Sequence, residues 1–195
     1  MNCTACVQHS CRQKQTCKAE SFDRQETLSD YHQSQTQAII QAAAHLVDDR
    51  AGDLSRLEEI FEFVQLRAYR KVGLAYCWGL EAWARRLTTL FKKKGIPLTA
   101  VSCTVGGQAQ TEINEHSNRS GVSCNPLSQA RQLMAEGVDF AIQLGLCLGH
   151  DILFTKEFAG DQTVLVVKDR RFDHSPLEGI PALERSFLTE NINKT

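Results

Sequence analysis

The sequence has no long basic stretch, no apolar run of membrane-spanning length, no internal repeat and no low-complexity segment. Its formal net charge is −1, and its only basic run is Lys92-Lys93-Lys94. That run falls in the last turn of an expected helix, where cations suit the helix dipole. A nucleic-acid partner is therefore not expected. Since nothing at the N-terminus resembles a signal peptide, we expect a soluble cytoplasmic protein with no membrane partner.

What the chain does contain is cysteine. Its 195 residues are 42% hydrophobic and 23% charged, which suits one sizeable domain with a buried core and a small appendage. Eight cysteines are present. In a reducing cytosol they are not expected to form structural disulfides, and metal binding or catalysis is the better explanation. The alternative for any single cysteine is a small buried apolar residue.

Half of the cysteines lie in residues 1–20, a polar segment with too few apolar side chains to form a core. A bound metal can replace a core in so short a segment. The spacing Cys-x2-Cys-x4-Cys-x5-Cys is near that of a zinc knuckle, and Cys-x2-Cys also opens many iron–sulfur sites. We therefore expect a metal-binding appendage over residues 1–20, with a disordered, oxidisable tail as the alternative. Its ligands would be Cys3, Cys6, Cys11 and Cys17.

Residues 21–195 predict a helical lead-in followed by an α/β domain. Helical spacing covers residues 22–49, and Asp53 is the expected N-cap of a second helix. Short apolar runs then alternate with helical patterns, which predicts a mainly parallel sheet with flanking helices, a Rossmann-like three-layer arrangement. The expected strands are Val72–Tyr76, Leu98–Ser102, Val138–Leu146 and Thr163–Val167. In the helix ending at Lys94, the expected buried stripe is Trp83, Leu87, Leu90 and Phe91.

The other four cysteines fall where elements of this sheet begin or end. Cys77, Cys103 and Cys147 follow three expected strands, and Cys124 precedes a helix with Asn125 as N-cap and Pro126 at its first position. The carboxyl ends of parallel strands meet at one edge, with neighbours about 4.8 Å apart. The four sulfurs are therefore expected to converge on one point and to hold one metal centre.

Two metal centres suit four cysteine ligands, a tetrahedral zinc ion and an iron–sulfur cluster. Helix N-termini lower thiol pKa values, which suits Cys77, Cys124 and Cys147 to be thiolates. Neighbouring glycines leave backbone amides free to donate to sulfur. This favours an iron–sulfur cluster slightly, with zinc as the second choice.

Polar side chains flank this edge and are candidates for acid–base roles. His150 and Asp151 follow Cys147, and Asp169 and His174 follow the last strand together with Arg170. Asp169, Arg170 and His174 could instead bind a small anion or substrate, and His150 could be a fifth metal ligand. The simpler alternatives are a turn or capping role for His150, a helix-start carboxylate for Asp151, and surface ion pairing for the rest. His116, in the long polar loop 108–123, is expected to be a solvated surface residue.

Several strings together resemble an uncharacterised, cysteine-rich prokaryotic family, domain-of-unknown-function family 1847, described as predicted metal-binding proteins. The resemblance implies metal binding and a bacterial or archaeal source, and it supplies no reaction. Thr104 stands where the family is expected to have a basic residue. The strings are Cys77-Trp-Gly-Leu80, Val101-Ser-Cys-Thr-Val-Gly-Gly107, Cys124-Asn-Pro-Leu-Ser-Gln-Ala130, Gly145-Leu-Cys-Leu-Gly-His-Asp151, Val167-Lys-Asp-Arg170 and His174-Ser-Pro176.

Three functions are compatible with these patterns. The first is a metal-binding module with a redox, electron-transfer or metal-sensing role, whose partners are metal ions and a redox protein or small molecule. The second is a metal- or thiolate-dependent enzyme acting on a small substrate in the crevice. The third is a structural zinc protein that serves as an interaction platform. An open coordination position would indicate the enzyme, because four cysteine ligands fill a zinc site.

Overall fold

The computed structural model describes residues 1–17 and 20–192, with side chains described as far as Arg185. The chain divides into two compact units, Met1–Ala51 and Gly52–Thr195. The domain boundary expected after residue 20 lies inside the first unit, beside Lys18 and Ala19, which are outside the described residues.

The first unit is helical and has few buried side chains. The single helical pattern predicted over residues 22–49 is interrupted at His32 and Gln33, and Asp23 caps the first helix by accepting hydrogen bonds from the backbone N–H of Gln25 and Glu26. Among the described residues, only Ala42 and Leu46 of these helices are buried. The elements are η1 (Cys3–Ala5), η2 (Ser10–Gln13), α1 (Arg24–Tyr31), α2 (Ser34–Ala44) and a π-helical turn, η3 (His45–Asp49).

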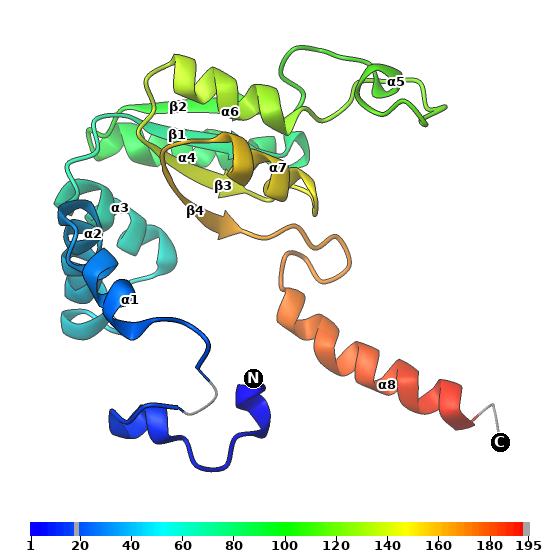
Figure 1. The fold of residues 1–195 in the computed structure, drawn as a ribbon. Helices are drawn as coiled ribbons and strands as arrows, with labels where there is room; N and C mark the ends of the chain where they lie inside the picture. Colours follow the sequence, from blue (N-terminus) through cyan, green and yellow to red (C-terminus); the bar gives the residue numbers. More distant parts are fainter. Residues whose placement is uncertain (18–19, 193–195) are drawn as a thin grey trace. The chain divides into compact units, whose positions relative to one another are not determined.

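The second unit contains a parallel sheet, which confirms the predicted α/β class (Figure 1). In the described residues its strand order is β2-β1-β3-β4. The first two strands have the predicted bounds. The third begins at Phe140, two residues later than predicted, and ends at Leu144 because Gly145 takes the left-handed φ of 62° and turns the chain. The fourth begins two residues earlier and ends one residue earlier than predicted. The strands are β1 (Val72–Tyr76), β2 (Leu98–Ser102), β3 (Phe140–Leu144) and β4 (Asp161–Val166).

Helices cover both faces of the sheet, because alternate residues of each strand point to opposite sides. Leu74 of β1 packs in a core cluster with α3 and α4, while the next residue, Ala75, packs in a second cluster with α6 and α7. The result is the expected three-layer arrangement. The remaining elements are α3 (Arg56–Leu66), η4 (Trp78–Leu80), α4 (Glu81–Lys93), α5 (Gln110–Ile113), α6 (Pro126–Ala135), α7 (His150–Glu157), η5 (Pro176–Glu178) and α8 (Gly179–Ile192).

Two local predictions were wrong. The N-cap of α3 is Ser55, which forms a capping box with Glu58, and not Asp53. On α4, Leu87 and Phe91 are buried as predicted, but Trp83 is 56% exposed and Leu90 is 41% exposed. These two side chains line a pocket instead of the core.

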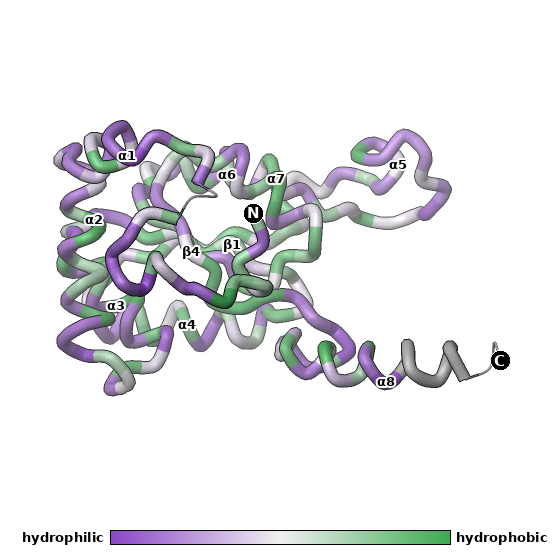
Figure 2. The backbone as a smooth tube through the Cα atoms, turned by 60° about the horizontal axis from the view of Figure 1, so that its bottom comes forward, coloured by the Kyte–Doolittle hydropathy of each residue, from purple (hydrophilic) through white to green (hydrophobic). Residues whose placement is uncertain are grey.

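The loop 108–123 is largely hydrophilic and extends away from the sheet (Figures 1 and 2). It contains the short helix α5 and closes on itself through an antiparallel bridge between Ala109 and Val122. His116 is exposed in this loop, as predicted.

Candidate functional site

The carboxyl edge of the sheet carries the core cysteines. Cys77 follows β1 directly and donates its backbone N–H to Leu144 of β3. Cys103 follows β2 and donates its backbone N–H to Tyr76 of β1 at 2.9 Å. Its carbonyl accepts the N–H of Asn125 at 2.7 Å, which brings Cys124 alongside it. Backbone hydrogen bonds of the sheet therefore place these three thiols together.

Sulfur contacts link the same three residues. The Sγ atoms of Cys103 and Cys124 lie 3.5 Å apart, and the thiols of Cys77 and Cys103 share a hydrogen bond. The backbone N–H of Trp78 donates to the Sγ atom of Cys103 at 3.4 Å. Cys147 differs, because its Sγ atom accepts a hydrogen bond from Nη2 of Arg170 at 3.3 Å.

Hydrogen bonding sets the protonation of this cluster. The Cys103 thiol donates to Cys77 and lowers the pKa of Cys77 well below its ordinary value, against the effect of burial. The backbone N–H of Gly79 and the ammonium group of Lys168 lower it further. The same hydrogen bond, together with burial, raises the pKa of Cys103. Cys77 is therefore the thiolate of the pair and Cys103 the proton donor.

Gln129 of α6 holds two of the strand ends together. Its side chain is fully buried, and its Nε2 donates to the carbonyl oxygens of Tyr76 at 3.2 Å and Val101 at 2.9 Å. Sequence reasoning missed this residue. The available signal was its spacing with Pro126 and Leu133, which places an amide on the buried face of α6.

The candidate acid–base residues are mostly engaged with backbone. Asp151 accepts the N–H groups of Gly149 and Ile152 at the start of α7, and Asp169 accepts those of Arg171 and Phe172 in a turn. His150 opens α7, where its backbone N–H donates to the carbonyl of Cys147 at 2.9 Å.

His174 lies beside the cysteine site. Its Nδ1 is 3.0 Å from the carbonyl oxygen of Val167 and 3.2 Å from the backbone nitrogen of Asp169. Within the described residues Nε2 has no hydrogen-bond partner, so this ring atom is available to a bound molecule.

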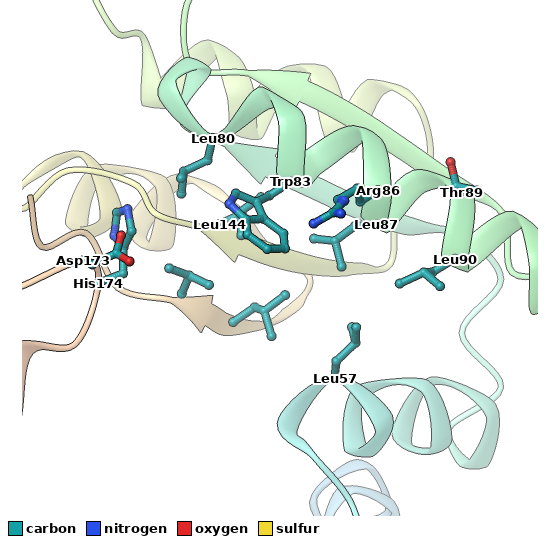
Figure 3. A pocket seen from close by; sticks show the side chains of 12 residues that line it. Leu57, Leu80, Trp83, Arg86, Leu87, Thr89, Leu90, Leu144, Asp173 and His174 are labelled. Carbon is teal, nitrogen blue, oxygen red and sulfur yellow. The ribbon is translucent and has the colours of Figure 1, made fainter.

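Two adjoining pockets open at this edge of the sheet. A polar pocket of about 360 Å³ is lined by Cys77, Lys168 and Arg170 among others. An apolar pocket of about 710 Å³ lies next to it, and the two share Leu80, Asp173 and His174 (Figure 3). Sequence reasoning missed the apolar pocket, since α4 presented a single apolar stripe.

Metal ligation is not preformed. Across residues 1–17 and 20–192, no group of three or more His, Cys, Asp or Glu side chains is arranged to hold a metal ion. None of the eight cysteines, all of which the structure describes, is in a disulfide. In the first unit, Cys3 and Cys11 are exposed, and Cys6 and Cys17 are half-buried. The structure thus groups Cys77, Cys103 and Cys124 and leaves Cys147 facing Arg170.

In the part of the chain that the structure describes, no helix has the length and apolarity needed to cross a membrane.

Comparisons with known proteins assign a family and no activity. The chain is 33% identical over 178 residues to "Uncharacterized protein MJ0455" of Methanocaldococcus jannaschii, covering 90% of this chain and 91% of that protein. No solved structure matches the chain. Residues 14–165, which include the four core cysteines and Cys17, match the family described as "Protein of unknown function (DUF1847)". The chain therefore belongs to this family, as its motifs predicted.

Proposed function

We propose that the protein binds a metal centre through Cys77, Cys103, Cys124 and Cys147, with an iron–sulfur cluster favoured over zinc. The observation that carries the proposal is the 3.5 Å separation between the sulfurs of Cys103 and Cys124, with Cys77 hydrogen-bonded to the same group. Tetrahedral zinc with bonds of about 2.3 Å holds its sulfurs about 3.8 Å apart, so the spacing of Cys103 and Cys124 suits two ligands of one metal.

The charges around the sulfurs support the same proposal. Four thiolates around a divalent ion leave an excess negative charge, which needs compensation in a partly buried site. Lys168 approaches Cys77 and Arg170 approaches Cys147, so two cations face the cluster. Backbone N–H groups of Trp78 and Gly79 also donate to sulfur. Such hydrogen bonds tune iron–sulfur clusters, which favours a cluster over zinc.

Cys147 completes the ligand set in this proposal. A negative charge on Cys147 raises the pKa of Cys124, so Cys147 lies near enough to interact with it electrostatically. An iron–sulfur cluster bound here would supply one-electron transfer. The protein would then have a redox, electron-transfer or metal-sensing role, with a redox protein or small molecule as partner. A second metal would bind Cys3, Cys6, Cys11 and Cys17.

The test is analysis of protein purified without oxygen. We expect iron and acid-labile sulfide in similar amounts, and a broad visible absorption that decreases on chemical reduction. Zinc without sulfide would keep the metal centre and reject the cluster. Protein that retains neither metal, even after anaerobic reconstitution with iron and sulfide or with zinc, would contradict the proposal.

One observation favours an enzyme as the second candidate. The polar pocket reaches Cys77 and carries Lys168, Asp169 and His174 on its wall. A metal- or thiolate-dependent reaction on a small substrate would use this crevice, with His150, Asp151, Asp169 or His174 in acid–base roles. Spectroscopy that finds three sulfur ligands and one exchangeable position on the metal would favour the enzyme over an electron carrier.

A further inference from the structure

The apolar pocket has the size and lining of a ligand site. Its volume of about 710 Å³ falls within the range of about 300–1,000 Å³ that is typical of small-molecule pockets. Leucines make up half of its lining residues, and Trp83 and Val166 add further apolar surface. The high exposure of Trp83 and Leu90 leaves this apolar surface in contact with water, so that an apolar ligand would gain by covering it.

Two polar side chains of the pocket lie together at one end. Figure 3 shows Asp173 and His174 at the end opposite Thr89 and Leu90, with Trp83 between them. That polar end opens into the pocket that contains Lys168 and Arg170. A molecule that fills both pockets would therefore have an apolar body and a polar head near Cys77.

The hydrogen-bond donors at this end favour an anionic head. Lys168 and Arg170 face sulfur atoms and form no ion pair with a carboxylate in the described part of the chain. The negative groups of this pocket are Asp169, Asp173 and the thiolate of Cys77. The carboxylate of Asp169 accepts the N–H groups of Arg171 and Phe172, so Lys168 and Arg170 are the charged donors that remain for a ligand.

A further cation lies along the apolar body of the pocket. The guanidinium of Arg86 stacks 4.9 Å from the ring centre of Trp83 and has no acidic partner among the described residues. The neighbouring Arg85, in contrast, pairs with Glu81 at 2.5 Å. A planar cation that is unpaired beside apolar surface is suited to hydrogen-bond a carboxylate or a similar anion.

We propose that the two pockets form one binding site for a small organic anion with an elongated apolar or aromatic body. The body lies along Leu80, Trp83 and Leu90, and the acid group lies at the end formed by His174, Lys168 and Arg170. This inference goes beyond metal binding. The apolar pocket contains none of the cysteines, whereas the polar end shares Lys168 and Arg170 with the proposed metal centre, so metal content is measured as the control.

The test uses the full-length protein and the change in tryptophan fluorescence on ligand binding, with calorimetry alongside. Decanoate, decanol and decylammonium serve as probes with the same apolar body and different heads. We expect saturable binding of decanoate, weaker by about tenfold for the neutral or cationic head, as expected when a hydrogen-bonded charge is lost. Equal binding of the three probes, or no saturable binding of any of them, would overturn the proposal.

Matched variants locate the site. Leu90→Glu places a charge on the pocket wall, whereas Leu153→Glu changes a leucine of similar exposure, 44% against 41%, on α7. We expect Leu90→Glu to weaken decanoate binding by about tenfold or more, and Leu153→Glu to leave it unchanged. Likewise Lys168→Met should weaken binding and Lys156→Met should not. Metal content is measured in every variant, so that failure of this site and of the metal centre are distinguished. Equal effects within each pair would overturn the proposal.

Discussion

Cys147 is the residue whose surroundings separate the metal proposal from a simple cluster of thiols. Its sulfur faces the guanidinium of Arg170, whereas the sulfur of Cys103 contacts those of Cys77 and Cys124. A thiol that only balanced the charge of Arg170 would be dispensable for metal binding. A fourth ligand would not be, because three thiolates leave a coordination position open.

We expect Cys147→Ser to abolish the core centre and to leave the N-terminal one filled. A serine hydroxyl is not deprotonated at neutral pH and is a poor substitute for a thiolate ligand. The measurement is iron, zinc and sulfide per chain in anaerobically purified protein. Cys11→Ser is the control and should lose only the N-terminal metal. Full core metal content in Cys147→Ser would show that Cys147 is not a ligand.

Tyr69 gives the fold a dependence on alkaline pH. Burial and a hydrogen bond from its hydroxyl to Asp161 raise the pKa of Tyr69 from 10.0 to about 12. Because the pKa is higher in the folded state, the neutral phenol stabilises the fold fully below pH 10, and this contribution is lost between pH 10 and 12.

Tyr69→Phe removes this contribution. We expect it to lower the free energy of unfolding by about 1 kcal/mol at neutral pH, since a partly buried carboxylate loses its donor. The difference between variant and wild type should shrink as the pH rises from 10 towards 12. Urea titrations across this range measure both effects. A difference that stays constant with pH would mean that Tyr69 does not titrate in the folded protein.

At the scale of elements, the sequence predicted a strand or helix correctly where its apolar pattern matches the side chains that are buried. The bounds of β1 and β2 were predicted to the residue, because each apolar run ends at a polar or cysteine turn. The pattern on α4 was misleading, because an apolar stripe is the same whether a neighbouring element covers it or a pocket opens beside it. Trp83 and Leu90 were therefore assigned to the core although they are exposed.

The sequence predicted where the candidate site lies in the fold, but it did not predict which side chains contact the cysteines. Strand order placed Cys77, Cys103 and Cys147 on neighbouring strand ends as expected. The contacts of Lys168 with Cys77, and of Arg170 with Cys147, depend on the path of the turn after β4. No periodicity specifies that path, since side-chain packing between distant segments determines it.

The turn after β3 depends on a glycine. Gly145 has a φ of 62°, and a Cβ atom there would overlap the side chain of Leu80. Gly107 has almost the same φ, 63°, but among the described residues nothing lies within 4 Å of its Cβ position. Alanine variants at the two positions therefore separate the energetic cost of backbone strain from that of steric overlap.

We expect Gly107→Ala to lower the free energy of unfolding by about 1 kcal/mol, because alanine is strained in the left-handed backbone conformation. Gly145→Ala should cost about 1–3 kcal/mol more, because Leu80 must move within a packed wall. Leu80 also lines both pockets, so the same variant should weaken decanoate binding. Urea denaturation provides the stability difference. Equal losses in the two variants would mean that Leu80 moves aside at no cost.

At the scale of the whole molecule, the two sets of cysteines belong to different units. Both core clusters of the α/β unit draw on residues between Leu57 and Val166, and the N-terminal cysteines lie in the unit Met1–Ala51. Residues 1–17 contribute no buried side chain, so ligation of a metal is the main source of order that their sequence offers.

Removal of residues 1–20 should therefore separate the two centres. We expect the shortened chain to unfold cooperatively in urea with an unchanged midpoint, because the m-value and stability follow the surface buried by the α/β unit. Its metal content should fall by the share bound to Cys3, Cys6, Cys11 and Cys17, and its visible absorption should be retained. Cys11→Ser in the full chain is the matched control for metal loss without truncation. A shortened chain that loses the absorption or unfolds without cooperativity would show that the appendage is part of the core centre, and would replace two independent sites by one that both units build.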